Sequence, residues 1–380
     1  MSCPICECDQ IKRLYRFCDN MKIMGASFPN TPAFVAKCEK CGLIFTDSEF
    51  TQENLLDYYR HGAVAPKYYD MFGEGDTREY YAHLQGIIKD YLTKDSAILD
   101  IAGSWGEFAF YLKEQGYENV TVLDPNENCI KYAGGNGIKT IQADSTDMSS
   151  IEDDSIDMII LNHSLEHILD VKGTMKEIRR IIKKTGYLFI EIPDIEGYEK
   201  EEAAPYNFLT YEHVLHMSMN DMENLANNYG FSIIDSGSYY KKVSNYPSIF
   251  AILQVGDYGE IRCSGTSEEC MNRYLKKSER VLSEFIEPLR KSQESLILWG
   301  IGASTAILIE SFAGCNVSML VDRNPVRQGL IFSIDEKLFE IKDPAEVNDG
   351  TIVILSIPYH DSIKKQIMDM GLSNKIVALK

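Results

Sequence analysis

The sequence alternates between helical and extended patterns from about residue 76 to residue 255, and this alternation limits the fold more than any other feature. Apolar residues first recur at helical spacing, and a short apolar strand over 97–101 follows them. Further extended segments come at 120–123 and 155–161, with a third short strand before Gln142. Strands that alternate with helices predict an α/β fold built on a doubly wound parallel sheet.

Glycines and acids follow these strands where a parallel sheet binds its ligands. Gly103 and Gly106 form the turn after the first strand, and glycine lets the backbone approach a ligand closely because it has no Cβ. Asp124 ends the next strand, where an acid suits two ribose hydroxyls, and Asp144 follows the third. Taken singly, a glycine turn and an acid equally fit a dinucleotide site or ordinary turn chemistry.

A second strand, turn and helix pattern begins at residue 296, after a polar, mostly helical stretch over 264–294. Its turn contains Gly300 and Gly302, and its next strand leads to Asp322. Thr305 replaces the third glycine of a dinucleotide fingerprint, so nucleotide binding and a purely structural role both stay open. We expect three parts: a zinc-binding module with a linker helix over 1–75, a nucleotide-binding domain over 76–255, and a helical linker with a Rossmann-like domain over 256–380.

Four of the ten cysteines form two Cys-x-x-Cys pairs near the N-terminus. The pairs are Cys3 with Cys6 and Cys38 with Cys41, and each can supply two thiolates to a tetrahedral zinc ion. Four thiolates leave no open position on the metal, so the predicted zinc site is structural. Cys8 and Cys18 compete as ligands, and buried free thiols are the alternative interpretation.

The balance of charge favours a small-molecule substrate. The chain carries 57 Asp and Glu against 38 Lys and Arg, a formal net charge of -19. Binding to a nucleic-acid backbone depends on clustered basic residues, so we expect no nucleic-acid partner. An anionic nucleotide sugar remains possible because helix N-termini can hold phosphate whatever the net charge. We find no leader sequence and no apolar stretch long enough for a bilayer, which predicts a cytoplasmic protein without a membrane partner.

The full series of motifs resembles the class I S-adenosylmethionine-dependent methyltransferases. The motifs that carry this resemblance are Asp100-Ile-Ala-Gly-Ser-Trp-Gly106, Leu123-Asp-Pro125, Ala143-Asp144 and Leu165-Glu-His167. The family implies S-adenosylmethionine as cofactor, with Asp100, Gly103 and Gly106 beside its methionine part. It also implies Asp124 on the ribose and Asp144 near the adenine, and we assign His163 to the same cofactor site. Ala102 stands where many members have glycine.

The order of parts along the whole chain resembles the sugar C-methyltransferases that act on deoxysugar nucleotides. Their C-terminal domain is similar to the segment Asp322-Arg-Asn-Pro325-x-x-Gln328-Gly329, and they also begin with a four-cysteine zinc module. The resemblance implies a nucleotide-linked sugar as substrate, a step of carbohydrate biosynthesis, and a Glu-His pair in which the histidine is the general base. That pair matches Glu212 and His213, and a second family histidine, against the sugar keto group, aligns with His167.

These residues suit methyl transfer to carbon next to a ketone. Such a carbon becomes nucleophilic only after losing a proton, which needs a base and a donor to stabilise the enolate. We hypothesise that His213 removes the proton, Glu212 orients the imidazole or stabilises its charged form, and His167 steadies the oxyanion. His163 and His216 are weaker candidates. One or two tyrosines of an aromatic segment could line the acceptor pocket. These are Tyr58, Tyr59, Tyr68, Tyr69, Tyr80 and Tyr81.

Other functions stay open at this point. An O- or N-methyltransferase acting on an activated sugar or a surface glycan precursor needs a base but no ketone. A dinucleotide-dependent oxidoreductase would use the turn at Gly300 and Gly302, and a non-catalytic scaffold would leave Glu212 and His213 without a role.

Overall fold

The computed structural model describes residues 1–18, 28–29, 31–61, 67, 70–71, 73–200, 205–210, 212–242, 246–302, 305–357 and 359–379. By their contacts they divide into two units, and we describe each unit on its own. The first comprises Met1–Leu14, Val35–Glu201 and Glu212–Met271, and the second Tyr15–Phe34, Glu202–Tyr211 and Asn272–Lys380. The three-part division that the sequence suggests remains a prediction. Tyr68 and Tyr69 lie outside the described residues.

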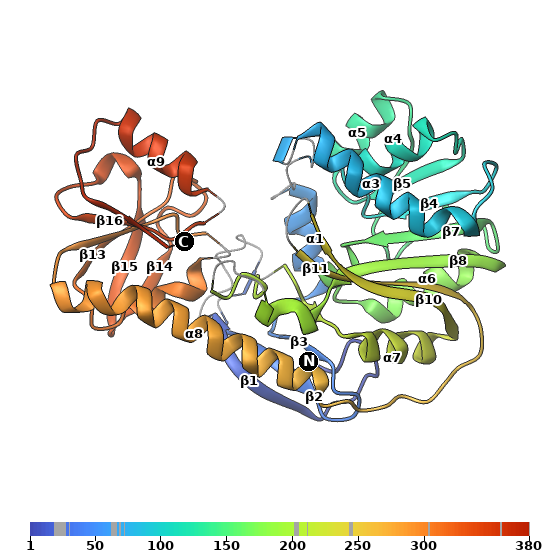
Figure 1. The fold of residues 1–380 in the computed structure, drawn as a ribbon, viewed down its shortest axis with the longest axis horizontal. Helices are drawn as coiled ribbons and strands as arrows, with labels where there is room; N and C mark the ends of the chain where they lie inside the picture. The colour runs from blue at the N-terminus through green and yellow to red at the C-terminus, as the bar shows by residue number, and fades with distance from the viewer. Residues whose placement is uncertain are drawn as a thin grey trace. The chain divides into compact units, whose positions relative to one another are not determined.

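A seven-stranded sheet forms the centre of the first unit, in the order β10-β11-β8-β7-β4-β5-β6 (Figure 1). Its strands are β4 (Ile98–Ile101), β5 (Val120–Asp124), β6 (Lys139–Gln142), β7 (Ile156–Asn162), β8 (Ile182–Pro193), β10 (Phe231–Lys241) and β11 (Tyr246–Val255). The five strands from β8 to β6 are parallel, and β11 runs antiparallel to both its neighbours. The chain order reverses beside β4, so the crevice between the carboxyl ends of β4 and β7 is where such a sheet binds ligands.

Helices cover both faces of this sheet (Figure 1). The helical segments of the first unit are α1 (Gln52–His61), α3 (Glu74–Ile88), η2 (Lys89–Tyr91), α4 (Glu107–Glu114), α5 (Glu127–Gly135), η3 (Leu165–His167), α6 (Val171–Ile181), η4 (Ile195–Lys200) and α7 (Met219–Tyr229). Helix α6 shows why they form: Val171, Met175 and Ile178 recur at helical spacing and are buried, and the Asp170 carboxylate caps the first turn by accepting from Gly173 N at 2.8 Å. A core of apolar residues from α3, α4 and β4 packs on one face.

A small four-stranded sheet contains the N-terminal strands, in the order β1-β2-β3-β9. Its strands are β1 (Ile11–Cys18), β2 (Ala33–Cys38), β3 (Ile44–Asp47) and β9 (Leu215–His216). Strand β9 pairs antiparallel with β3, with His216 opposite Ile44 and Leu215 opposite Phe45. The segment that follows the second cysteine pair therefore lies beside the segment that follows His213.

The second unit is built on a six-stranded sheet in the order β14-β15-β13-β12-β16-β17. Its strands are β12 (Leu296–Trp299), β13 (Val317–Val321), β14 (Ile331–Ile334), β15 (Lys337–Lys342), β16 (Thr351–Ile354) and β17 (Ile376–Ala378), and its helices are η5 (Ala306–Phe312), η6 (Pro344–Glu346) and α9 (His360–Asp369). Helix α8 (Thr266–Ser292) precedes the sheet, and only β14 is antiparallel to its neighbour.

The predicted α/β fold is confirmed, with a doubly wound sheet in the centre of the chain and a second Rossmann-like sheet near its end. One element differs from the expected pattern. The helix after the second glycine turn is the 3₁₀ segment η5, and the two residues after Gly302 lie outside the described residues.

Candidate active site

The turn after β4 has the backbone geometry of a ligand-binding loop. Gly106 adopts φ of 75°, and a Cβ on Gly103 would lie 2.7 Å from Oδ2 of Asp100, so both positions require glycine. Ala102 and Ser104 also have positive φ, at 55° and 50°. Non-glycine residues in this region cost about 1–3 kcal/mol each, and such strain concentrates at binding sites. A glycine at position 102 would adopt this conformation without strain.

Two carboxylates lie at this edge of the sheet. Asp124 accepts from Ser104 N at 2.9 Å through one oxygen and from Asn126 N at 2.8 Å through the other, which fastens the turn to the end of β5. Burial, and then the charge of Asp124, raise the pKa of Asp100 to about 7. Burial also raises the pKa of Asp124, although both backbone N–H groups oppose the shift. Each carboxylate oxygen has a second lone pair for a ligand hydroxyl or ammonium group.

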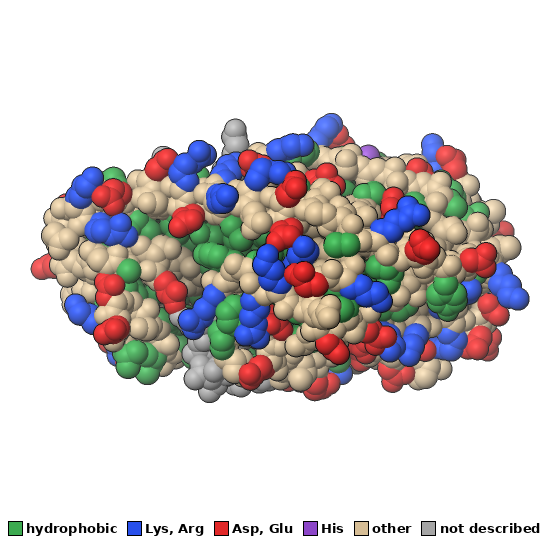
Figure 2. Space-filling model, turned by 90° about the horizontal axis from the view of Figure 1, so that it is seen from below, with side chains coloured by type: hydrophobic (Ala, Val, Ile, Leu, Met, Phe, Trp, Pro, Cys, Tyr) green, Lys and Arg blue, Asp and Glu red, His purple; other side chains and the backbone are tan. Residues whose placement is uncertain are grey.

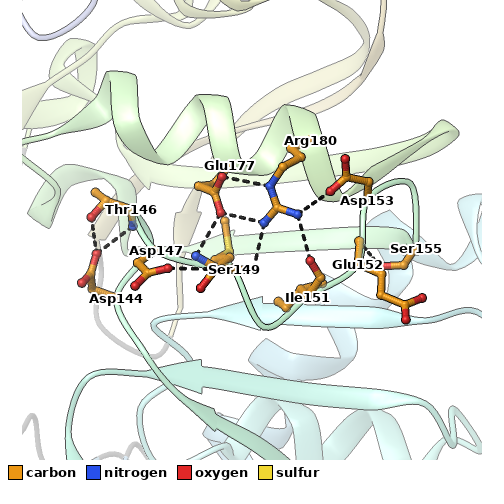
Figure 3. Close-up of polar contacts among 11 residues, drawn as sticks. Asp144, Thr146, Asp147, Ser149, Ile151, Glu152, Asp153, Ser155, Glu177 and Arg180 are labelled. Carbon is orange, nitrogen blue, oxygen red and sulfur yellow. Dashed lines mark hydrogen bonds and ion pairs between the residues drawn. The ribbon is translucent and has the colours of Figure 1, made fainter.

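Asp144 begins a loop that hydrogen bonds connect to helix α6 (Figure 3). Its Oδ1 accepts from Thr146 N at 2.8 Å and from the Thr146 hydroxyl. Arg180 on α6 then donates to the carbonyl oxygens of Met148 and Ile151, both at 2.9 Å, and pairs with Glu177 at 2.7 Å. The loop after Asp144 is therefore held in place by Arg180.

His163, directly after β7, lies between two buried glutamates. Its Nδ1 is 3.1 Å from Oε1 of Glu166 and its Nε2 is 2.9 Å from Oε1 of Glu191. Ionised carboxylates only accept, so both ring nitrogens donate and His163 is an imidazolium. Burial lowers the pKa of His163, as does Lys241, but the two glutamates outweigh them and the net direction is upward. Because both nitrogens have protein partners, the predicted contact of this imidazole with the cofactor is not supported.

A second histidine pair, His167 and His213, lies next to this network. The two rings meet edge to face with centroids 4.8 Å apart. Nδ1 of His167 is 3.0 Å from the carbonyl oxygen of Glu212 and 3.0 Å from the Tyr59 hydroxyl. A carbonyl only accepts, so Nδ1 carries a proton, and Nε2 becomes a donor only when the ring is charged.

His213 is an unprotonated base in the folded protein. Burial, and then the charges of His167, His216 and His163, hold the pKa of His213 well below its usual value. Its Nδ1 is buried and has no hydrogen-bond partner among the described residues. An imidazole in this state can accept a proton, which is the property that a general base requires.

Glu212 does not have the contact that the sequence predicted for it. Its carboxylate accepts from the Tyr58 hydroxyl, and in the described part of the chain it has no hydrogen bond to His213. The pair is adjacent in sequence, but the two side chains take different directions. The described residues show no direct contact through which Glu212 would orient His213, so its predicted role stays a prediction.

Sequence reasoning missed the two buried glutamates. Glu166 is 1% exposed and Glu191 is fully buried, and they join His163 to the rest of the site. Glu191 had a signal in the sequence, since it is an acid inside the otherwise apolar run over 188–193. Tyr59 and Tyr58, two of the aromatic candidates, do reach the site from α1, whose end is fastened by Asn126 Nδ2 donating to Tyr59 O at 2.7 Å.

Comparison with known proteins identifies the central region. Residues 75–236 match the family model described as "Methyltransferase domain". This region is a methyltransferase domain. The predicted enzyme class, an S-adenosylmethionine-dependent methyltransferase, is confirmed at this level. No curated protein matches the sequence.

Several solved structures are similar to the methyltransferase domain. The PH0226 protein of Pyrococcus horikoshii OT3 is 21% identical, with 50% of this chain and 99% of that one covered and a TM-score of 0.41. A SAM-dependent methyltransferase of Methanosarcina mazei is 21% identical, with 46% and 98% covered and a TM-score of 0.39. The 1,6-didemethyltoxoflavin-N1-methyltransferase of Burkholderia thailandensis is 13% identical, with 58% and 97% covered and a TM-score of 0.41.

Four cysteines cluster beside the methyltransferase domain. The sulfurs of Cys3, Cys6, Cys38 and Cys41 lie within 4.8 Å of one another, with contacts of 3.6 Å (Cys3 to Cys41) and 3.5 Å (Cys6 to Cys38). A tetrahedral ion with sulfur ligands at about 2.3 Å would separate its ligands by about 3.8 Å, so the cluster fits a metal. Cys8 instead accepts from Gln10 N at 3.4 Å, and the side chain of Cys18 lies outside the described residues.

The cysteine segment is attached to the domain close to His213. Helix α7 reaches it through Asn228 Nδ2, which donates to Ile5 O at 2.8 Å. Thr46 on β3 donates from its backbone to Val214 O at 2.9 Å and from its hydroxyl to His213 O at 3.2 Å. His216, one of the weaker candidates, lies on β9, and burial lowers its pKa to about 3.

The described residues give no sign of a membrane span, since no helix among them is both long and apolar enough. On the face shown in Figure 2, acidic and basic side chains are interspersed.

Proposed function

We propose that the chain transfers a methyl group from S-adenosylmethionine to a carbon next to the ketone of a nucleotide-linked deoxysugar. The observation that carries this proposal is His213, a buried neutral imidazole whose ring centroid lies 4.8 Å from that of a second histidine, His167. The resemblance to sugar C-methyltransferases supports the nucleotide sugar as substrate.

The edge of the sheet provides the groups that S-adenosylmethionine needs. Asp124 would accept from the ribose hydroxyls, and Asp144 would lie beside the adenine. The N-terminus of α4 and Asp100 suit the carboxylate and the ammonium of the methionine part. Bound S-adenosylmethionine supplies an electrophilic methyl group, and the protein must align the acceptor with it to within about 3–3.5 Å.

The protein then has to create the nucleophile. His213 takes the proton from the sugar carbon, and the electrons of that C–H bond move toward the ketone oxygen. His167 stabilises the resulting oxyanion through Nε2–H in its charged form, with Nδ1–H held by the Glu212 carbonyl. Preorganised donors of this kind contribute roughly 10²–10³ to a rate.

We infer that the four-cysteine cluster binds zinc and is structural. Four buried thiolates without an open position suit zinc, and the bound ion would stabilise the segment that positions Thr46. Closely spaced thiols that form no disulfide among the described residues also support the predicted cytoplasmic location. Replacing Cys38 with serine should remove about one equivalent of zinc by elemental analysis; an unchanged zinc content would contradict this assignment.

The test uses S-adenosylmethionine labelled with ¹³C in its methyl group and a panel of nucleoside diphosphate-linked 4-keto sugars. We expect a product whose labelled methyl is bonded to a ring carbon by two-dimensional NMR, and turnover reduced at least roughly 10³-fold in His213→Asn. His360→Asn, which changes a histidine of α9, is the control and should keep full rate. A methyl on oxygen, or full activity of His213→Asn, would overturn the proposal.

A further inference from the structure

We propose that Glu166, rather than Glu212, is the carboxylate that stabilises the charged form of His213 and thereby sets its strength as a base. This inference rests on the proposed function and deepens it. Glu166 acts through His213 and is therefore a positioning residue.

The geometry places Glu166 next to the base. A carboxylate oxygen of Glu166 and one ring nitrogen each of His167 and His213 all lie within 4.8 Å of one another. Glu166 is 1% exposed, and its Oε2 is buried without a hydrogen-bond partner among the described residues. Nδ1 of His213 is in the same condition within that part of the chain. Oε2 of Glu166 and Nδ1 of His213 are thus both buried polar atoms without a partner in the described structure, and such atoms call for an explanation because leaving them unpaired costs free energy.

A backbone hydrogen bond holds the segments that carry Glu166 and His213 together. Val214 N donates to Glu166 O at 2.7 Å, which ties η3 to the residue after the base. Thr46 fixes the same segment from β3 through its bonds to His213 O and Val214 O. Glu166 and His213 are therefore held from two sides, whereas the Glu212 carboxylate is bound to Tyr58.

The other oxygen of Glu166 is held by a second histidine. Oε1 lies 3.1 Å from Nδ1 of His163, whose Nε2 lies 2.9 Å from Oε1 of Glu191. When His213 takes a proton from the sugar carbon, the positive charge forms next to the Glu166 carboxylate.

The other charges near His213 oppose its protonation. Those of His167, His216 and His163 all disfavour a positive charge on it, as does burial. Glu166 and Glu191 both bond to His163 through Oε1. Among the described residues, Glu166 is the carboxylate that shares a cluster of potential ligand atoms with His167 and His213.

The test measures proton abstraction without methyl transfer. The full chain is incubated in D₂O with a nucleoside diphosphate-linked 4-keto-6-deoxy sugar and S-adenosylhomocysteine, and deuterium entry at carbon is followed by mass spectrometry across a pH range. Glu166→Gln should reduce exchange roughly 100-fold and move the acidic limb of the profile to lower pH by about 1–3 units, because His213 loses an adjacent negative charge. Glu212→Gln, the matched control, should leave the limb where it is.

Glu166→Asp keeps the charge and should restore part of the rate and of the limb. It is also the variant to measure if Glu166→Gln fails to fold, as judged by circular dichroism and binding of S-adenosylhomocysteine. Unchanged exchange and an unmoved limb in Glu166→Gln, complete loss of exchange in a folded Glu166→Asp, or a shift produced by Glu212→Gln would overturn the proposal. Exchange that persists in His213→Asn would instead show that the proposed base itself is wrong.

Discussion

The seven-stranded and six-stranded sheets begin in the same way and then diverge. Each has a strand, a glycine turn and a second strand followed by an aspartate, Asp124 in one and Asp322 in the other. Each aspartate accepts from the backbone N–H two residues later, at 2.8 Å from Asn126 and 2.7 Å from Asn324. Both sheets therefore have this hydrogen bond between aspartate and backbone, and it does not by itself define an active site.

The two sheets differ in the residues that surround Asp124 and Asp322. In the methyltransferase domain the second oxygen of Asp124 is bonded to the turn, whereas Asp322 faces Arg327 at 3.5 Å. The guanidinium of Arg327 also packs against Gly302, 2.8 Å from where a Cβ would be. In the methyltransferase domain His163 follows β7 and Glu191 lies near the end of β8, the fourth and fifth strands of the sheet along the chain, while β16 is followed by Leu355 and Ser356.

The largest expected effect concerns a buried charge that only one sheet has. The third residue of β4 is Asp100, and the third residue of β12 is Leu298. The pKa of folded Asp100 is about 7 against an ordinary 3.8, so the folded state binds the proton more tightly and loses stability as pH rises from 3.8 to about 7. Asp100→Asn should raise the stability of the first unit at pH 8 by on the order of 4 kcal/mol and weaken S-adenosylmethionine binding.

The measurement for Asp100→Asn is chemical denaturation of both proteins at pH 8 and at pH 4. The gain should shrink to under about 1 kcal/mol at pH 4, where the carboxyl is protonated in the folded protein and close to its midpoint of 3.8 in the unfolded chain. Equal stability at pH 8 would mean that Asp100 is not a buried charge.

A second pair of variants separates the two aspartates. Asp124→Ala should weaken S-adenosylmethionine binding roughly 100-fold, about 3 kcal/mol, because it removes the acceptor for the ribose and the anchor of Ser104 N. Asp322→Ala should leave that affinity unchanged by calorimetry. Equal losses would show that the two sheets share one cofactor site.

The glycines give a smaller contrast. A methyl group on Gly103 would press on Asp100 and Val122 inside the turn, whereas one on Gly302 would meet a flexible arginine. Gly103→Ala should reduce S-adenosylmethionine affinity about tenfold, or 1.4 kcal/mol, and Gly302→Ala should not change it. A loss confined to Gly302→Ala would reverse the assignment.

The smallest expected effect tests the link between the cysteine segment and the base. Thr46→Val removes the hydroxyl that bonds to His213 O while keeping the shape of the side chain. We expect turnover to fall several-fold, in line with about 1 kcal/mol for one hydrogen bond, with unchanged affinity for S-adenosylmethionine. A change in that affinity with normal turnover would argue against the link.

The sequence predicted the sheet better than the site. Periodicity located β4, β5 and β7 within one or two residues, because apolar strands between helices leave few arrangements. Adjacency in sequence misled for Glu212, since neighbouring side chains in an irregular segment take different directions. Glu191 comes from a different strand than the one His163 follows, so their contact depends on strand order, which no local pattern encodes, whereas Glu166 is only three residues from His163.

The most direct measurement is isothermal titration of the wild-type protein with S-adenosylmethionine and then with NAD. We predict one S-adenosylmethionine bound per chain with micromolar affinity and no heat with NAD, as a cofactor site confined to the methyltransferase domain requires. Firm binding of NAD with no response to S-adenosylmethionine would contradict the account and move the active site to the six-stranded sheet.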